Sequence, residues 1–184
     1  MTANHARIAA LLVAILAAAA LRLVPHPPNF SPIDAMALFS GAYLGRRWLA
    51  FAAPLGALLL SDLLLGFYPG MLFQYASVAL IVVLGMVALS RVTVPRLGGA
   101  AIASSVLFFA VTNFGVWLVS GMYAQTLSGL AACYVAAIPF FQNTVAGDLF
   151  YAALLFGGFA LAERFVPRLR AGEPQPARVA TSAS

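Results

Sequence analysis

The sequence predicts an all-α protein, a polytopic membrane helix bundle of about six transmembrane helices. Hydrophobic residues make up 63% of the 184-residue chain and charged residues only 8%, whereas soluble domains carry about 25% charged residues. The mean hydropathy is +0.97. The apolar residues fall into runs separated by Pro, Gly and Arg. These features predict a single transmembrane domain over residues 1–170, followed by a disordered cytoplasmic tail over 171–184 that is rich in Pro, Ala, Ser and Thr.

Six apolar runs define the predicted spans. A bilayer core of roughly 30 Å needs about 20 helical residues, and five of the runs fit that length. The second run is short, so we expect a partial span there. A further segment, 127–141, is moderately apolar but has polar neighbours, and we expect a short helix that lies at the membrane surface or dips into it. The six predicted spans are residues 8–24, 33–44, 48–65, 71–89, 100–119 and 145–166.

The distribution of arginine predicts the orientation. All ten basic residues are arginines, and with six crossings and a cytoplasmic N-terminus nine of them fall on the cytoplasmic side. Only Arg22 falls outside. Such a bias is typical of multi-pass proteins. It predicts that both termini lie in the cytoplasm, and it supports counting the short second run as a span. We expect the lipid bilayer, and no nucleic acid, as a partner, because the positive charge is spread over short gaps.

Polar residues gather in one predicted layer. Ionisable groups at membrane depth are costly and indicate function by default. With this topology Arg22, Asp34, Asp62 and Asp148 all lie in the outer half of the bilayer. Amide and aromatic residues share that layer, so we predict a small-molecule pocket open to the outside. The candidate substrate-binding residues are Arg22, Asn29, Asp34, Asp62, Gln74, Asn113, Trp117, Asn143, Asp148 and Tyr151.

Structural interpretations of the same residues stay open. Ser31 and Asp34 match a capping box at the start of the second span. Arg22 can neutralise a buried charge by pairing with either Asp62 or Asp148.

The uncharged members of the set also have structural alternatives. Trp117 fits an interfacial aromatic belt. Gln74 and Asn113 can hydrogen-bond between helices. His26, in a proline-rich external loop, is expected to be neither a ligand nor a catalyst.

Catalytic signatures are lacking, so we expect no enzyme, no metal and no cofactor. The lone Cys133 excludes an internal disulfide and a multi-cysteine metal site. The chain has no Gly-x-Ser-x-Gly or His-Glu-x-x-His motif. It has no lysine and therefore no phosphate-binding loop for ATP. An aspartyl pair formed by Asp62 and Asp148 is the remaining catalytic hypothesis.

Small residues form a stripe on the first helix. Ala10, Ala14 and Ala18 follow i, i+4, i+8 spacing, which permits the close approach of another helix.

Several segments carry a resemblance. They are residues 22–32, 60–62, 112–117, 133–144 and 147–148. Together they resemble an uncharacterised bacterial membrane-protein family, which is itself similar to the substrate-binding S components of energy-coupling-factor (ECF) vitamin transporters. The resemblance implies an external ligand pocket, a transmembrane coupling subunit docked on Ala10, Ala14 and Ala18, and separate ATPases.

The leading functional hypothesis is a membrane-embedded substrate-binding component for uptake of a small polar or vitamin-like molecule. The alternative is a non-transporting membrane scaffold or assembly protein whose buried Asp and Arg residues are structural. A stable protein complex with no small-molecule dependence favours the alternative.

Overall fold

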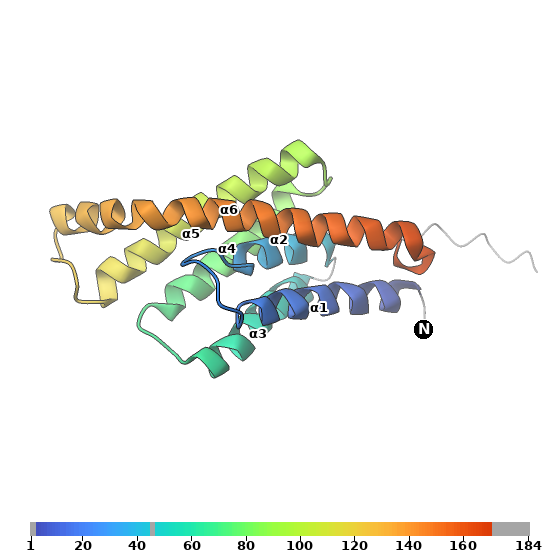
Figure 1. Cartoon of the computed structure of the whole chain (residues 1–184), viewed down its shortest axis with the longest axis horizontal. Coiled ribbons are helices and arrows are strands. Elements are labelled where there is room, and N and C mark those ends of the chain that lie inside the picture. The colour runs from blue at the N-terminus through green and yellow to red at the C-terminus, as the bar shows by residue number, and fades with distance from the viewer. Residues whose placement is uncertain (1–2, 45–46, 171–184) are drawn as a thin grey trace, which may run out of the picture.

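The computed structural model describes residues 3–44 and 47–170, and over these residues the chain is all-helical (Figure 1). The predicted fold class is confirmed. Arg46 and the predicted disordered tail at 171–184 lie outside the described residues. The elements are α1 (Ala3–Leu21), α2 (Ile33–Tyr43), α3 (Arg47–Leu65), α4 (Met71–Ala88), α5 (Val94–Val119), α6 (Leu127–Phe165) and the 3-10 turn η1 (Pro167–Leu169).

Four of the described helices are long and apolar enough to cross a membrane: α3, α4, α5 and α6. The apolar part of α1, His5–Leu21, is slightly shorter. These helices support a membrane location for the protein. α1 ends at Leu21, three residues before the end of the predicted span, so Arg22 lies in the turn that follows the helix.

The short second predicted span is a short, buried helix. α2 has 11 residues and is therefore about 16 Å long at 1.5 Å per residue, which is too short to cross the bilayer alone. Nine of its residues are buried, from Ile33 to Gly41. α2 packs on α3, α4 and α6, so its first turn lies inside the bundle.

Two glycines allow α2 and α4 to pack with their backbones in contact. A Cβ on Gly85 would lie 2.6 Å from the carbonyl oxygen of Leu38, and a Cβ on Gly41 would overlap the carbonyl oxygen of Val82. Close approach of this kind is the usual role of small residues between membrane helices. It holds the second half of α2 against the last turns of α4.

The last helix differs from the prediction. α6 is one continuous helix of 39 residues, about 58 Å long at 1.5 Å per residue. It joins the predicted surface segment to the predicted last span, with Pro139 inside it. Proline and the polar pair Gln142 and Asn143 interrupt the apolar run, which is why the sequence suggests two segments. Figure 1 shows the first half of α6 lying beside the end of α5, beyond the ends of the other helices.

A cluster around Arg7 connects several elements at the end of the bundle where α1 begins. Arg7 forms an ion pair with Glu163 and donates to the carbonyl oxygen of Leu169. Its guanidinium lies 5.6 Å from the ring centroid of Tyr43 and 5.1 Å from that of Phe159. This one side chain joins α1, α2, α6 and η1.

Candidate functional site

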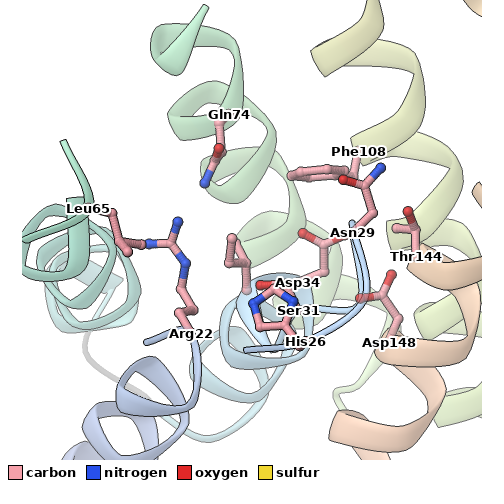
Figure 2. A pocket seen from close by; sticks show the side chains of 11 residues that line it. Arg22, His26, Asn29, Ser31, Asp34, Leu65, Gln74, Phe108, Thr144 and Asp148 are labelled. Carbon is pink, nitrogen blue, oxygen red and sulfur yellow. The ribbon is translucent and has the colours of Figure 1, made fainter. Parts of the chain in front are cut away.

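A cavity of about 230 Å³ lies where α1 and α3 end and where α2 and α4 begin. This volume far exceeds the roughly 10–15 Å³ that one water molecule requires, and it is below the range of about 300–1,000 Å³ typical of drug-sized ligands. It therefore suits a small molecule. The lining residues are Arg22, His26, Asn29, Ser31, Ile33, Asp34, Leu65, Gln74, Phe108, Thr144 and Asp148 (Figure 2).

Buried polar atoms without a hydrogen-bond partner gather at this cavity. In the part of the chain that the structure describes, they are Ser31 Oγ, both carboxylate oxygens of Asp34, and Gln74 Nε2. All three residues line the cavity. Leaving one such group unsatisfied costs about 1–3 kcal/mol. Within the described residues, the buried side-chain groups that lack a hydrogen-bond partner therefore gather at a single place.

Asp34 is not a helix cap, and the capping-box interpretation is wrong. The N-cap of α2 is Pro32, and no side chain caps the helix. The box needs Ser31 at the N-cap so that Asp34 falls on the third helical residue. Because the helix starts at Ile33, Asp34 is the second helical residue and Ser31 lies outside the helix. Asp34 is 3% exposed, and its carboxyl group lines the cavity instead.

Asp148 reaches the cavity from the middle of α6. It is 2% exposed, and its Oδ2 accepts a hydrogen bond of 2.5 Å from Ser105 of α5. Its carboxyl group lies close enough to that of Asp34 for the two to interact electrostatically. Figure 2 shows Asp148 and Thr144 on one side of the cavity and Arg22 on the other.

The loop over the cavity is held against α6. Asn143 Nδ2 donates to the carbonyl oxygen of Pro28 at 3.0 Å. Gly147 permits close contact as well, because a Cβ there would lie 3.1 Å from Phe30 Cα. Asn29, at the turn between these contacts, has φ 63°, a left-handed conformation that asparagine tolerates better than most residues. These contacts place Asn29 and His26 at the rim.

Arg22 pairs with Asp62 and not with Asp148. The Nη1 atom of Arg22 lies 3.0 Å from Asp62 Oδ1 and also donates to Ser61. Tyr75 donates to Asp62 Oδ2 at 3.0 Å. Both oxygens of Asp62 thus have a donor and its charge is matched, which confirms the structural interpretation of this pair. Asp62 does not line the cavity, whereas Arg22 does.

The amide of Gln74 is oriented by its neighbour Tyr68. The Tyr68 hydroxyl donates to Gln74 Oε1, and Gln74 Nε2 has no acceptor. Burial, reinforced by the Asp62 charge and opposed by Arg22, raises the pKa of Tyr68 to about 12. The hydroxyl therefore stays protonated at neutral pH and remains a donor. This bond links Gln74 to the turn before its own helix, so the predicted bond between helices is not what holds it.

Other predicted site residues lie elsewhere. Asn113 donates to the carbonyl oxygen of Phe109 within α5 and lines a neighbouring hollow. Trp117 Nε1 donates to the carbonyl oxygen of Ala124 at 2.9 Å, which ties the end of α5 to the connection before α6. Tyr151 packs on Phe30, with the ring centroids 5.5 Å apart. The cavity lining does not include Trp117, Tyr151 or Asn143.

Five of the ten predicted residues line the cavity: Arg22, Asn29, Asp34, Gln74 and Asp148. The sequence analysis missed Thr144, Phe108 and Ser105. Thr144 had a usable signal, because it precedes Asp148 by four residues and so shares its helix face. His26, which was expected to be neither a ligand nor a catalyst, lies at the rim of the cavity.

The alanine stripe packs inside the protein. Ala18 is buried, and Ala10 and Ala14 are half-buried against the core. α1 packs on α2 and α3, so the small side chains already serve contacts within this chain.

Comparison with known proteins gives a family but no function. A model described as a family of unknown function, DUF6580, matches residues 2–169. No curated protein and no solved structure matches the chain.

Proposed function

The chain belongs to the DUF6580 family of unknown function, and we propose that it is a membrane-embedded binding component for the uptake of a small polar molecule. One observation carries the proposal: the unpartnered buried polar atoms of Ser31, Asp34 and Gln74 line one cavity of about 230 Å³. A polar ligand would supply the missing partners. Stability alone gives no reason to keep these atoms together and unsatisfied.

The surroundings of the cavity support this role. The ion pair of Arg22 with Asp62 and the Asn143 contact to Pro28 brace its walls and its covering loop. A site held by satisfied hydrogen bonds binds with less loss of conformational freedom. In the predicted topology, which puts nine of ten arginines on the cytoplasmic side, the rim at His26 would face outward from a bacterial plasma membrane, as uptake requires.

Energy for transport would come from other proteins or from an ion gradient, because the sequence has no phosphate-binding loop. The resemblance to ECF S components favours a transmembrane coupling subunit with separate ATPases. Affinity purification from the native membrane tests this part, and co-purification of an ATPase is the expected result.

Mass spectrometry of small molecules released from the purified full-length protein tests the binding function. We expect a compound that co-purifies with the wild type and is depleted in the Gln74→Leu variant. Tyr151→Phe is the matched control, because Tyr151 lies outside the cavity, and it should retain the compound. A wild type that releases no compound and is stabilised by none in a thermal screen of polar metabolites would contradict the proposal.

A scaffold function is the second candidate, and the Arg22, Asp62 and Tyr75 network is the observation that favours it. Those polar groups are satisfied within the chain, as expected for structural residues. A stable protein complex that forms equally well with the Gln74→Leu variant would support it.

A further inference from the structure

We propose that the molecule bound in this cavity is a small organic cation whose N–H groups donate to Asp34 and Asp148. This inference rests on the proposed binding function and adds the chemical class of the ligand. Three properties of the cavity support it: its charge, its unpartnered donors and acceptors, and its size.

The charge at the cavity is unbalanced. The charged side chains that line it are Arg22, Asp34 and Asp148, with His26 at the exposed rim. The charge of Arg22 is matched by Asp62, which does not line the cavity. Neither Asp34 nor Asp148 has an ion-pair partner among the described residues. Two neighbouring carboxylates in a buried site are stabilised by a positive charge between them.

The hydrogen-bonding groups define which atoms the ligand offers. Neither oxygen of Asp34 has a hydrogen-bond partner among the described residues, so both are available to donors on the positive end of a ligand. Gln74 Nε2 is a free donor, and the Ser31 hydroxyl is free to donate or accept. A ligand with an ammonium or amidinium group and a separate hydrogen-bond acceptor would satisfy all of them. The ring of Phe108 also lines the cavity, and aromatic faces attract cations.

Other occupants fit less well. A proton shared by Asp34 and Asp148 would satisfy the acids but would leave Gln74 Nε2 without an acceptor. A single metal ion, like a proton, would occupy a small part of about 230 Å³ and would also leave Gln74 unpartnered. An anion would be repelled by both carboxylates. An organic cation accounts for the charge, the hydrogen bonds and the volume together.

The test compares the compounds released from full-length wild type, Asp34→Asn, Asp148→Asn and Thr144→Val. The asparagine variants keep the shape of the side chain and remove its charge. Thr144→Val is the matched control, because it removes a hydroxyl from the same cavity without changing the charge. Since charge-assisted hydrogen bonds are strong, we expect a compound that is cationic at pH 7. It should be depleted at least about tenfold in both asparagine variants and at most about threefold in Thr144→Val.

A stability measurement separates binding from a structural role. Among the described residues no donor within hydrogen-bond geometry satisfies the Asp34 carboxyl group, so Asp34→Asn should leave the thermal midpoint of ligand-free protein unchanged or raise it. A lower midpoint would mean that Asp34 is a structural group and would overturn the inference. Asp148→Asn provides the second variant, because its side-chain oxygen can still accept from Ser105.

The remaining outcomes distinguish this inference from the function it rests on. If the released compound is neutral or anionic and is depleted in the Gln74→Leu variant, the ligand is not a cation, but the proposed binding function still holds. An inorganic ion is a further possible outcome. It would be identified if no organic compound is released and if sodium chloride stabilises the wild type, but not Asp34→Asn, more than potassium chloride does. That result would overturn the inference. No released compound and no stabilisation by any polar metabolite would overturn both proposals.

Discussion

Three aspartates in one layer of the bundle have three different environments. Asp62 is 1% exposed, and each of its oxygens has a donor. Asp148 has one donor, Ser105. Asp34 has none. Because a buried charge is tolerated only when it is compensated, the first is a structural group and the last is the one that most requires a ligand.

Breaking the Arg22–Asp62 pair should destabilise the fold. Arg22→Gln leaves the Asp62 carboxylate buried without its counter-charge, which typically costs about 3–5 kcal/mol. Thermal unfolding in detergent should show a large drop in the midpoint. The double variant Arg22→Gln with Asp62→Asn should recover part of the loss, because no charge is then left uncompensated. Equal stability of the Arg22→Gln variant and the wild type would contradict a buried ion pair.

Removing the Tyr68 hydroxyl should affect the ligand more than the fold. In Tyr68→Phe the amide of Gln74 loses the donor that orients it, so its oxygen and nitrogen can exchange places. We expect a loss of roughly 1 kcal/mol in ligand binding, the usual net value of one hydrogen bond, which is about fivefold less compound retained. Tyr123→Phe is the control, and an equal loss in both variants would argue against orientation by Tyr68.

The helices owe their positions to features that hydropathy does not record. α2 reaches the interior because Gly41 and Gly85 let its backbone approach α4. α6 continues through Pro139, because a membrane helix can re-satisfy the backbone group that proline leaves free. The first feature places Asp34 in the cavity, and the second puts Thr144 and Asp148 in the middle of a long helix.

Substitution of Gly85 tests the contact between α2 and α4. A methyl group there meets the backbone of Leu38 at 2.6 Å, so Gly85→Ala must push the helices apart. Overpacking typically costs about 1–3 kcal/mol, and the thermal midpoint should fall. Gly56→Ala is the matched control, because a Cβ at that position would have no neighbour within 4 Å. It should gain up to about 1 kcal/mol from helix propensity, and a similar loss in both variants would contradict the close contact.

At the scale of the whole molecule, the cavity lies at one end of the bundle and the Arg7 cluster at the other. Arg22 and Asp34 belong to the first end, and Arg7 with Glu163 belongs to the second. The polar cavity opens at one end of the bundle, and the Arg7 cluster joins the helices at the other end. This arrangement suits a site that is reached from one side of the membrane. The direction in which it opens depends on the orientation of the chain.

Cysteine labelling tests the orientation. Cys133, the native cysteine, is replaced by alanine, and single cysteines are placed at the exposed positions Phe67 and Val92. The arginine distribution predicts that a membrane-impermeant maleimide labels Phe67→Cys in intact cells and labels Val92→Cys only after lysis. Labelling in the reverse order would invert the topology and would place the rim of the cavity in the cytoplasm.

The sequence by itself determined the helical class and the membrane location, and it grouped Arg22, Asp34 and Asp148, which line one cavity. Those follow from side-chain transfer energies and from chain order, which are local properties. It did not determine which members of the layer meet. Trp117 lies outside the cavity because α5 and α6 extend past the other helices, a feature invisible in the apolar runs.

Only the tertiary structure decided that Asp62 is neutralised and that Asp34 is not. α2 starts one residue later than the capping box requires, so Asp34 is the second helical residue, and it lines the cavity. The pairing of Arg22 depended on whether α3 or α6 lies nearer to the end of α1. Hydrogen bonds require donor and acceptor within about 3 Å, and apolar runs locate helix ends only to within a few residues. Packing therefore decided which buried carboxyl group has a partner among the described residues and which does not.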